Sequence, residues 1–278
     1  MTAGVSVESA IASHYATESL LDRIAAGLGA LGKDWTSVTA DDLKPVDEFH
    51  IGGLAATEAL LDQLNLQAGQ RVLDIGCGIG GTARHLVRRH GVSVHGVDLM
   101  PEFVETARAL CAAVGVPASF EAGSATDLPV PDHSFDVATL IHVGMNIEDK
   151  QAMFEEAARV LRPGGAFAIY DVMAQGEEPI DFPVPWSTAS DTSFLATPRQ
   201  YALAADAAGF RVVARRDRGD YARQYFDRLA ARAGEGGPSP VGLPLIMGGD
   251  AAAKIANLVH NLQRRRIAPV EMICRLPN

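Results

Sequence analysis

The sequence has 278 residues, with 24 Lys and Arg against 34 Asp and Glu, and a formal net charge of −10. This acidic balance disfavours nucleic acid or an anionic membrane surface as a partner, because both polyanions are bound by cationic faces. Hydrophobic residues make up 47% and charged residues 21% of the chain, which excludes a disordered or fibrous protein. The length indicates one large domain, or one domain with a smaller appendage.

The cysteines and the first residues bear on the compartment. Cys77, Cys111 and Cys274 lie far apart and form no CxxC pair, which favours a reducing compartment over a disulfide framework or a cysteine zinc site. The N-terminal residues lack the positive start and the apolar stretch of a signal peptide, and no run is long enough to span a bilayer. We therefore expect a cytoplasmic protein with neither nucleic acid nor membrane as partner, and a homodimer is allowed.

The pattern of apolar residues predicts helices at the start of the chain and an alternation of strands and helices after them. From residue 7 to about residue 31, apolar side chains recur mostly every three to five residues, as in an amphipathic helix or helix pair. A polar connector at 33–47 and the segment His50-Ile51-Gly52-Gly53 lead to a helix at 55–66. Strands are then expected at 71–75, 93–98, 118–121, 135–141 and 165–172, and helices at 81–90, 101–114 and 149–161. Strands joined by such helices form βαβ units and predict a doubly wound α/β fold.

Beyond residue 172 this alternation ends. The stretch 175–198 is rich in proline and aromatic residues. A helix is expected at 199–208, a strand at 210–216, helices near 221–231 and 250–264, and a last strand at 271–276. The roughly fifty residues between the last two strands far exceed a hairpin loop and indicate an inserted lid or binding wall.

A glycine-rich turn follows the first strand of the alternating region. In Leu73-Asp74-Ile75-Gly76-Cys77-Gly78-Ile79-Gly80, an apolar strand runs into this turn before a helix, which is typical of a site for a nucleotide-type ligand. The turn alone is compatible with NAD, FAD or S-adenosylmethionine. Asp74 favours the last of these, because a carboxylate at this position repels a pyrophosphate and attracts an ammonium or sulfonium group.

A second carboxylate, Asp98, ends the next strand. It lies 18 residues after Gly80, near the separation at which an acidic residue accepts hydrogen bonds from ribose hydroxyls. Leu99 and Met100 follow and would pack on an adenine face. A helix N-cap is the alternative role for Asp98, since a proline and a glutamate begin the next helix. Both features together favour ribose binding.

These motifs resemble those of the class I S-adenosylmethionine-dependent methyltransferases. Further matching segments are Gly96-Val97-Asp98, 123–129 with 134–136, and 159–165. Within that class the chain is similar to the small-molecule group that includes ubiquinone/menaquinone, tocopherol and sarcosine/dimethylglycine methyltransferases. The resemblance covers roughly residues 68–173 and implies S-adenosyl-L-methionine as cofactor. It also implies a Rossmann-like, mostly parallel seven-stranded sheet with an antiparallel last strand.

Elements and motifs together predict a single methyltransferase domain over residues 1–278. An N-terminal helical cap would occupy 1–54, the cofactor-binding core 55–173, and a substrate lid with the last strands 174–278. The resemblance places Tyr15 on a cap helix over the cofactor and assigns adenine recognition to Ser124 or the backbone of Ala125 and Thr126. The predicted cofactor-binding residues are Tyr15, Asp74, Gly76, Cys77, Gly78, Gly80, Asp98, Leu99, Met100, Ser124, Ala125, Thr126, Ile141 and His142.

Methyl transfer from a sulfonium is an in-line displacement, so most of the catalysis comes from holding the acceptor against the methyl group in a dry pocket. A phenol, hydroxyl or protonated amine must also lose a proton, and a histidine suits that task. His142 is the first candidate base and His50 the second, with a structural role at a strand end or in a turn as the alternative for each. The other histidines form no cluster at ligand spacing, so we expect no metal.

Trp186, Phe194, Tyr221 and Met247 are predicted to bind the acceptor, with a place in the lid's own core as the alternative. We expect methyl transfer from S-adenosyl-L-methionine to a small-molecule O, N or C acceptor, giving S-adenosylhomocysteine. The alternative is a relative that binds S-adenosylmethionine and catalyses a non-methylating reaction such as a cyclisation. A nicotinamide oxidoreductase is a third hypothesis, which Asp74 disfavours.

Overall fold

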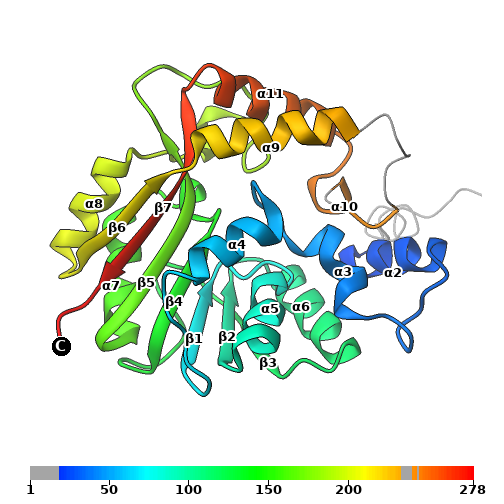
Figure 1. The fold of residues 1–278 in the computed structure, drawn as a ribbon, viewed down its shortest axis with the longest axis horizontal. Helices are drawn as coiled ribbons and strands as arrows, with labels where there is room; N and C mark the ends of the chain where they lie inside the picture. Colours follow the sequence, from blue (N-terminus) through cyan, green and yellow to red (C-terminus); the bar gives the residue numbers. More distant parts are fainter. Residues whose placement is uncertain (1–18, 233–239, 243) are drawn as a thin grey trace, which may run out of the picture.

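The computed structural model describes residues 19–232, 240–242 and 244–278. A seven-stranded sheet of order β3-β2-β1-β4-β5-β7-β6 runs through the molecule (Figure 1). The pairs from β3 to β5 are parallel, and β7 is antiparallel to both of its neighbours, which confirms the predicted fold class. The strands are β1 Arg71–Ile75, β2 Ser93–Asp98, β3 Ala118–Ala122, β4 Phe135–Ile141, β5 Leu161–Ala174, β6 Arg211–Asp217 and β7 Ile267–Arg275.

Apolar layers cover both faces of the sheet, because successive side chains of a strand point to opposite faces. Val72 packs in a cluster with Leu60 and Leu86, whereas the neighbouring Leu73 packs in a second cluster with Phe154. Side chains of α4, α5 and α6 belong to the first cluster, and side chains of α7 and α8 belong to the second. The helices of the described residues are α2 Leu20–Ala30, α3 Ala40–Asp47, α4 Gly53–Leu61, α5 Gly81–His90, α6 Pro101–Ala113, α7 Lys150–Val160, α8 Pro198–Ala207, α9 Gly219–Arg232, α10 Pro244–Met247 and α11 Ala251–Gln263, with short 3-10 turns η1 Gly144–Asn146 and η2 Ser190–Thr192.

Most predicted elements lie within a few residues of the observed ones, and the exceptions have local causes. Helix α3 lies inside the segment predicted as a connector; it begins with a capping box between Thr39 and Asp42. Helix α4 ends at Leu61, five residues earlier than expected. Strand β7 begins four residues earlier than expected, because it continues through Pro269, whose carbonyl accepts a hydrogen bond from the N–H of Arg218. Of the helix expected over 7–31, only α2 falls within the described residues.

A buried ion pair joins the cap helices to the sheet. Helix α3 ends at Asp47, whose carboxylate accepts hydrogen bonds from Arg84 of α5. Arg84 is only 1% exposed and also donates to the carbonyl of Ile79 at 2.8 Å. Gly81 allows this approach, because a Cβ there would lie 2.3 Å from the carbonyl oxygen of Asp47. The pair therefore fixes the end of the cap against the turn that follows β1.

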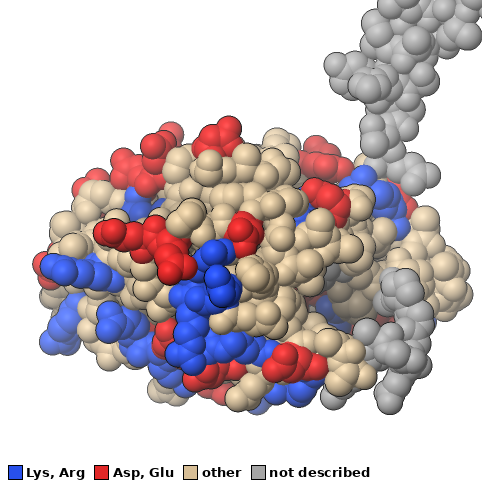
Figure 2. Space-filling view, turned by 90° about the horizontal axis from the view of Figure 1, so that it is seen from above, with Lys and Arg blue, Asp and Glu red and all other residues tan. Residues whose placement is uncertain are grey.

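The segments around the last strands form a wall over one end of the sheet. Helices α9 and α11 contact each other and β7, and lie across the top of the molecule in Figure 1. Acidic and basic side chains are mixed on the face that these helices present (Figure 2). The loop between β5 and α8 is tied to α11 by hydrogen bonds between Asn261 and the backbone of Asp181, and between Asn257 and the carbonyl of Pro183. None of the described helices is long and apolar enough to cross a bilayer.

We expect Arg84→Leu to lower the free energy of unfolding by about 3–5 kcal/mol, because the carboxylate of Asp47 would then be buried without its partner. Urea unfolding measures this loss. Arg162→Leu is the control, since it removes an ion pair with Asp136 that is partly exposed, for which the loss should be at most about 1 kcal/mol. Equal losses in the two variants would contradict the structural role of the buried pair.

Candidate active site

The glycine turn lies where β1 ends, at the centre of the sheet. Gly76, Gly78 and Gly80 have φ values of +72°, +52° and +81°, in the left-handed region that glycine adopts without strain. A Cβ on Gly76 would lie 2.2 Å from the side chain of Val143, which follows the neighbouring strand β4. The turn can therefore lie close to the ends of both strands only with glycine at this position.

A cavity of about 830 Å³ opens beside this turn, and we call it the turn cavity. It is lined by most of the predicted cofactor-binding residues: Asp74, Gly76, Cys77, Gly78, Asp98, Leu99, Met100, Ser124, Ala125, Thr126, Ile141 and His142. Gly80 does not line it and instead packs against Phe120 and Arg84 at the start of α5. Tyr15 lies outside the described residues.

Asp98 is held by two backbone groups. Its carboxylate accepts hydrogen bonds from the N–H of Gly78 at 2.8 Å and from the N–H of Met100 at 2.9 Å. Helix α6 has Met100 as its N-cap residue, so Asp98 is not that cap. Burial raises the pKa of Asp98. Because each oxygen can accept more than one hydrogen bond, the carboxylate retains capacity for ligand hydroxyls.

Asp74 carries an unpaired oxygen at the wall of the turn cavity. The side chain is 2% exposed, and its Oδ1 accepts a hydrogen bond from the hydroxyl of Thr139 at 2.8 Å. Its Oδ2 is buried and has no hydrogen-bond partner among the described residues. Burial raises the pKa of Asp74 to about 7, and the charge of Asp98 adds to this effect. A buried carboxylate oxygen without a partner fits a cationic group of a ligand in the cavity.

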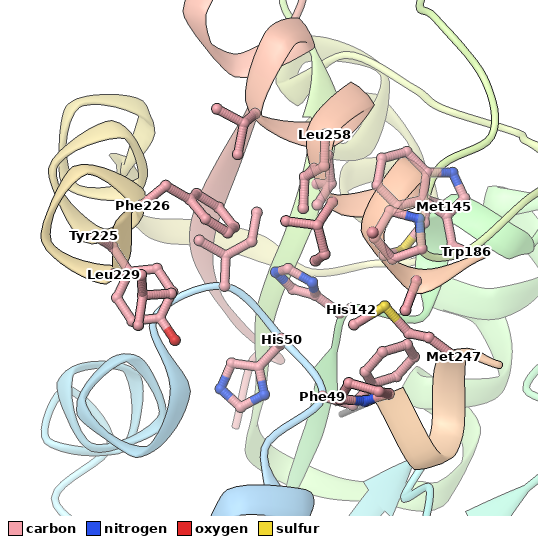
Figure 3. A pocket seen from close by; sticks show the side chains of 18 of the residues that line it. Phe49, His50, His142, Met145, Trp186, Tyr225, Phe226, Leu229, Met247 and Leu258 are labelled. Carbon is pink, nitrogen blue, oxygen red and sulfur yellow. The ribbon is translucent and has the colours of Figure 1, made fainter. Parts of the chain in front are cut away.

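A second cavity of about 690 Å³ adjoins the first, and we call it the apolar chamber (Figure 3). Phe49, His50, His142, Asn146 and Trp186 line both cavities. Apolar side chains of α9, α10 and α11 supply most of the remaining wall, among them Tyr225, Phe226, Leu229, Met247, Ile255 and Leu258. None of the described residues that line the chamber is Lys or Arg.

The four residues predicted to bind the acceptor occupy different places. Trp186 and Met247 line the apolar chamber, whereas Phe194 lines the turn cavity. Tyr221 lines neither cavity. Its ring packs against Gly52, where an added Cβ would lie only 2.7 Å from the ring. The Arg218 guanidinium lies over the Tyr221 ring, 4.2 Å from its centroid.

Several lining residues were missed by the sequence analysis. Phe49 lines both cavities but belongs to no motif. The face of α11 was detectable, because its lining residues recur every three or four positions, as on one face of a helix. They are Ala251, Ala252, Ile255, Leu258 and Val259.

Two histidines lie at the boundary of the cavities, with ring centroids 5.7 Å apart. His142 follows β4 with φ +55°, and its buried Nε2 has no partner among the described residues. Burial lowers the pKa of His142 well below its usual range, and His50 lowers it further. Burial also lowers the pKa of His50 to about 4. Both rings are therefore neutral near pH 7 and able to accept a proton.

Part of the chain is similar to known methyltransferases. Residues 73–169 match the family described as a methyltransferase domain. The methyltransferase GfsG of Streptomyces halstedii is 36% identical over 137 residues, 49% of each chain. The 27-O-demethylrifamycin SV methyltransferase of Amycolatopsis mediterranei (strain S699) is 40% identical over 119 residues, 42% of this chain and 44% of that protein. These matches support the predicted resemblance to the class I S-adenosylmethionine-dependent methyltransferases. The chain spans about half the length of these two curated relatives.

The fold of this chain is shared over nearly its whole length with a solved structure. The [4+2]-cyclase SpnF superposes with a TM-score of 0.63 at 19% identity, covering 93% of this chain and 97% of that one. The matching domain supports the predicted family and its cofactor, S-adenosyl-L-methionine. The unpaired oxygen of Asp74 and the spare acceptor capacity of Asp98 fit the cation and the hydroxyls of that cofactor.

We expect the affinity for S-adenosylmethionine to rise with pH up to about 7 and then to level off. A cation beside Asp74 favours the ionised carboxylate, so binding below the pKa of about 7 releases a proton. Isothermal titration calorimetry from pH 5.5 to 8.5 measures this, and Asp74→Asn should weaken binding by about 10- to 100-fold and flatten the profile. Asp132→Asn, on the surface, is the control. An unchanged slope in Asp74→Asn would show that another group titrates.

Asp98→Ala should weaken S-adenosylmethionine binding by about 10- to 100-fold, since hydrogen bonds to a charged group are lost. Because Asp98 also holds the N–H of Gly78, circular dichroism and the melting temperature should be recorded with the calorimetry. Unchanged affinity in a folded variant would remove the ribose assignment.

Proposed function

We propose that the protein transfers a methyl group from S-adenosyl-L-methionine to an O, N or C centre of a small molecule, giving S-adenosylhomocysteine. The observation that carries this proposal is the wall that the turn cavity and the apolar chamber have in common, formed by residues such as His142 and Trp186. The cofactor supplies an electrophilic methyl group. A shared wall lets an acceptor in the chamber meet a cofactor in the turn cavity, which is the arrangement that in-line displacement in a dry site requires.

The chamber favours a neutral, largely apolar acceptor. Its described lining contains no Lys or Arg, and Asp227 is its only described carboxylate. A phosphate or carboxylate buried there would lose its hydration without gaining a cationic partner, which is unfavourable. The relative named for 27-O-demethylrifamycin SV supports a hydroxyl oxygen as the first acceptor type to test.

We also propose a cytoplasmic location and a free small molecule, with neither nucleic acid nor membrane, as the partner. Cys77, Cys111 and Cys274 are buried free thiols, which fits a reducing compartment. The net charge of −10 supports a partner other than a polyanion.

The test is a screen with S-adenosylmethionine and pairs of lipophilic alcohols or phenols and their phosphate esters, with S-adenosylhomocysteine measured by mass spectrometry. We expect product with the neutral member of a pair and little with its ester. Ile255→Trp places a larger side chain in the chamber and should raise the acceptor KM by about tenfold or more, because the acceptor loses apolar contacts there. Cofactor affinity should stay unchanged.

Leu203→Trp, at an exposed position on α8, is the matched control for added bulk. Turnover of an acceptor without S-adenosylhomocysteine would support the cyclisation alternative instead. Preference for the phosphate esters would contradict the neutral acceptor.

A further inference from the structure

The imidazole of His50 is surrounded on one side by oxygen atoms. Its Nε2 lies 3.2 Å from the carbonyl oxygen of Gly53, 3.0 Å from the hydroxyl of Thr57 and 3.4 Å from Oε2 of Glu48. The hydroxyl of Thr57 donates its hydrogen to Glu48 at 2.9 Å, so it can only accept from His50. All three neighbours are therefore acceptors, and Nε2 carries the proton of the neutral ring.

This tautomer leaves the lone pair of the ring on Nδ1. No described residue makes a hydrogen bond to Nδ1. His50 lines both the turn cavity and the apolar chamber, and it lies in the chamber wall close to His142 (Figure 3). The free nitrogen thus belongs to a side chain that can meet an acceptor beside the methyl donor.

Glu48 places a carboxyl group beside Nε2 of His50. Its side chain is 8% exposed, and burial raises its pKa to about 7, with Asp47 and Asp74 adding to the effect. Above that pH a carboxylate faces Nε2, where it would stabilise the imidazolium that forms when Nδ1 takes a proton. Such support matters because burial alone lowers the pKa of His50 to about 4.

His142 has no comparable support. Its Nε2 is buried without a partner among the described residues, and its backbone N–H donates to the carbonyl of Tyr170. The ring of Tyr170 also faces His50, with its centroid 6.0 Å away. Burial raises the pKa of the Tyr170 hydroxyl, so this group is neutral near pH 7, and Glu48 is the group that can stabilise a cation there.

We propose that Glu48 and Thr57 are positioning residues that hold His50 as its Nε2–H tautomer and present Nδ1 as the base for an acceptor hydroxyl. This rests on the proposed function. The O–H bond of the acceptor breaks and its proton passes to Nδ1. The oxygen forms a bond to the methyl carbon as the carbon–sulfur bond of S-adenosylmethionine breaks, leaving S-adenosylhomocysteine, the methyl ether and an imidazolium that returns its proton to solvent.

The first test needs no acceptor. The full chain with 15N-labelled histidine is studied by NMR at pH 8, and the His50 signals are assigned by their loss in His50→Gln. The nitrogen shifts should show the Nε2–H tautomer. Glu48→Gln should lower the pKa of His50 by one unit or more, and Thr57→Val should give a mixture of tautomers.

Glu58→Gln is the matched control, because it removes a half-exposed carboxylate of α4, next to Thr57, that faces His85 instead. It should leave the His50 signals unchanged. A His50 ring in the Nδ1–H form, or a His50 pKa unaffected by Glu48→Gln, would overturn the proposal whether or not an acceptor is known. The wild-type tautomer decides the matter even if a variant fails to fold.

The second test uses an acceptor from the screen. Glu48→Gln should lower kcat by about 10- to 100-fold, as for weakened general base catalysis, while the acceptor KM and the cofactor Kd change by less than about threefold. With cofactor kept saturating at every pH, which removes the effect of Asp74 on binding, the acidic limb of the wild-type kcat profile near pH 7 should also be lost. A retained limb would overturn the role of Glu48. The expected NMR result in a protein that methylates nothing would instead refute the proposed function alone.

Discussion

The arrangement of both cavities depends on the buried ion pair between Asp47 and Arg84. It joins the end of α3 to α5, and α5 begins directly after the glycine turn. Phe49 and His50, which follow Asp47 by two and three residues, line both cavities. A buried pair of this kind resists displacement, because separating it would leave a charge without a partner in an apolar setting. The glycine turn and the wall that the two cavities share are therefore held to each other by this contact.

This arrangement concentrates negative charge. Beyond the effect of burial, Asp47 and Asp74 both raise the pKa of Glu48, whereas Arg84 lowers it. The pKa values of Glu48 and Asp74 are raised to about 7, so the folded protein binds protons that the unfolded chain releases near pH 4. These two groups therefore reduce folding stability as the pH rises from about 4 to 7. A cationic cofactor offsets that loss, which makes the same charges unfavourable for the empty site and favourable for the bound one.

The parts of the site predicted from sequence are those with a local physical cause. The turn at Gly76 and the carboxylates of Asp74 and Asp98 follow from backbone geometry and strand ends, so short motifs are sufficient. The start of β7 was missed because Pro269 suggests a strand boundary, although its carbonyl still takes part in a hydrogen bond. Tyr221 was misplaced because an aromatic residue in an insertion does not show which side of its helix faces a cavity.

The oxygen atoms around Nε2 of His50 had no sequence signal at all. Glu48, His50 and Thr57 come together because the chain reverses at Gly52 and Gly53, whose φ values are positive. The burial of His50 in the cavity wall weakens it as a base, since it disfavours the imidazolium. A dry acceptor site and an effective histidine base are thus in conflict, and a buried carboxylate on the far side of the ring is one physical solution. The apolar walls from α9 and α11 can then vary with the acceptor while the charged groups that support His50 remain on the cap and α4.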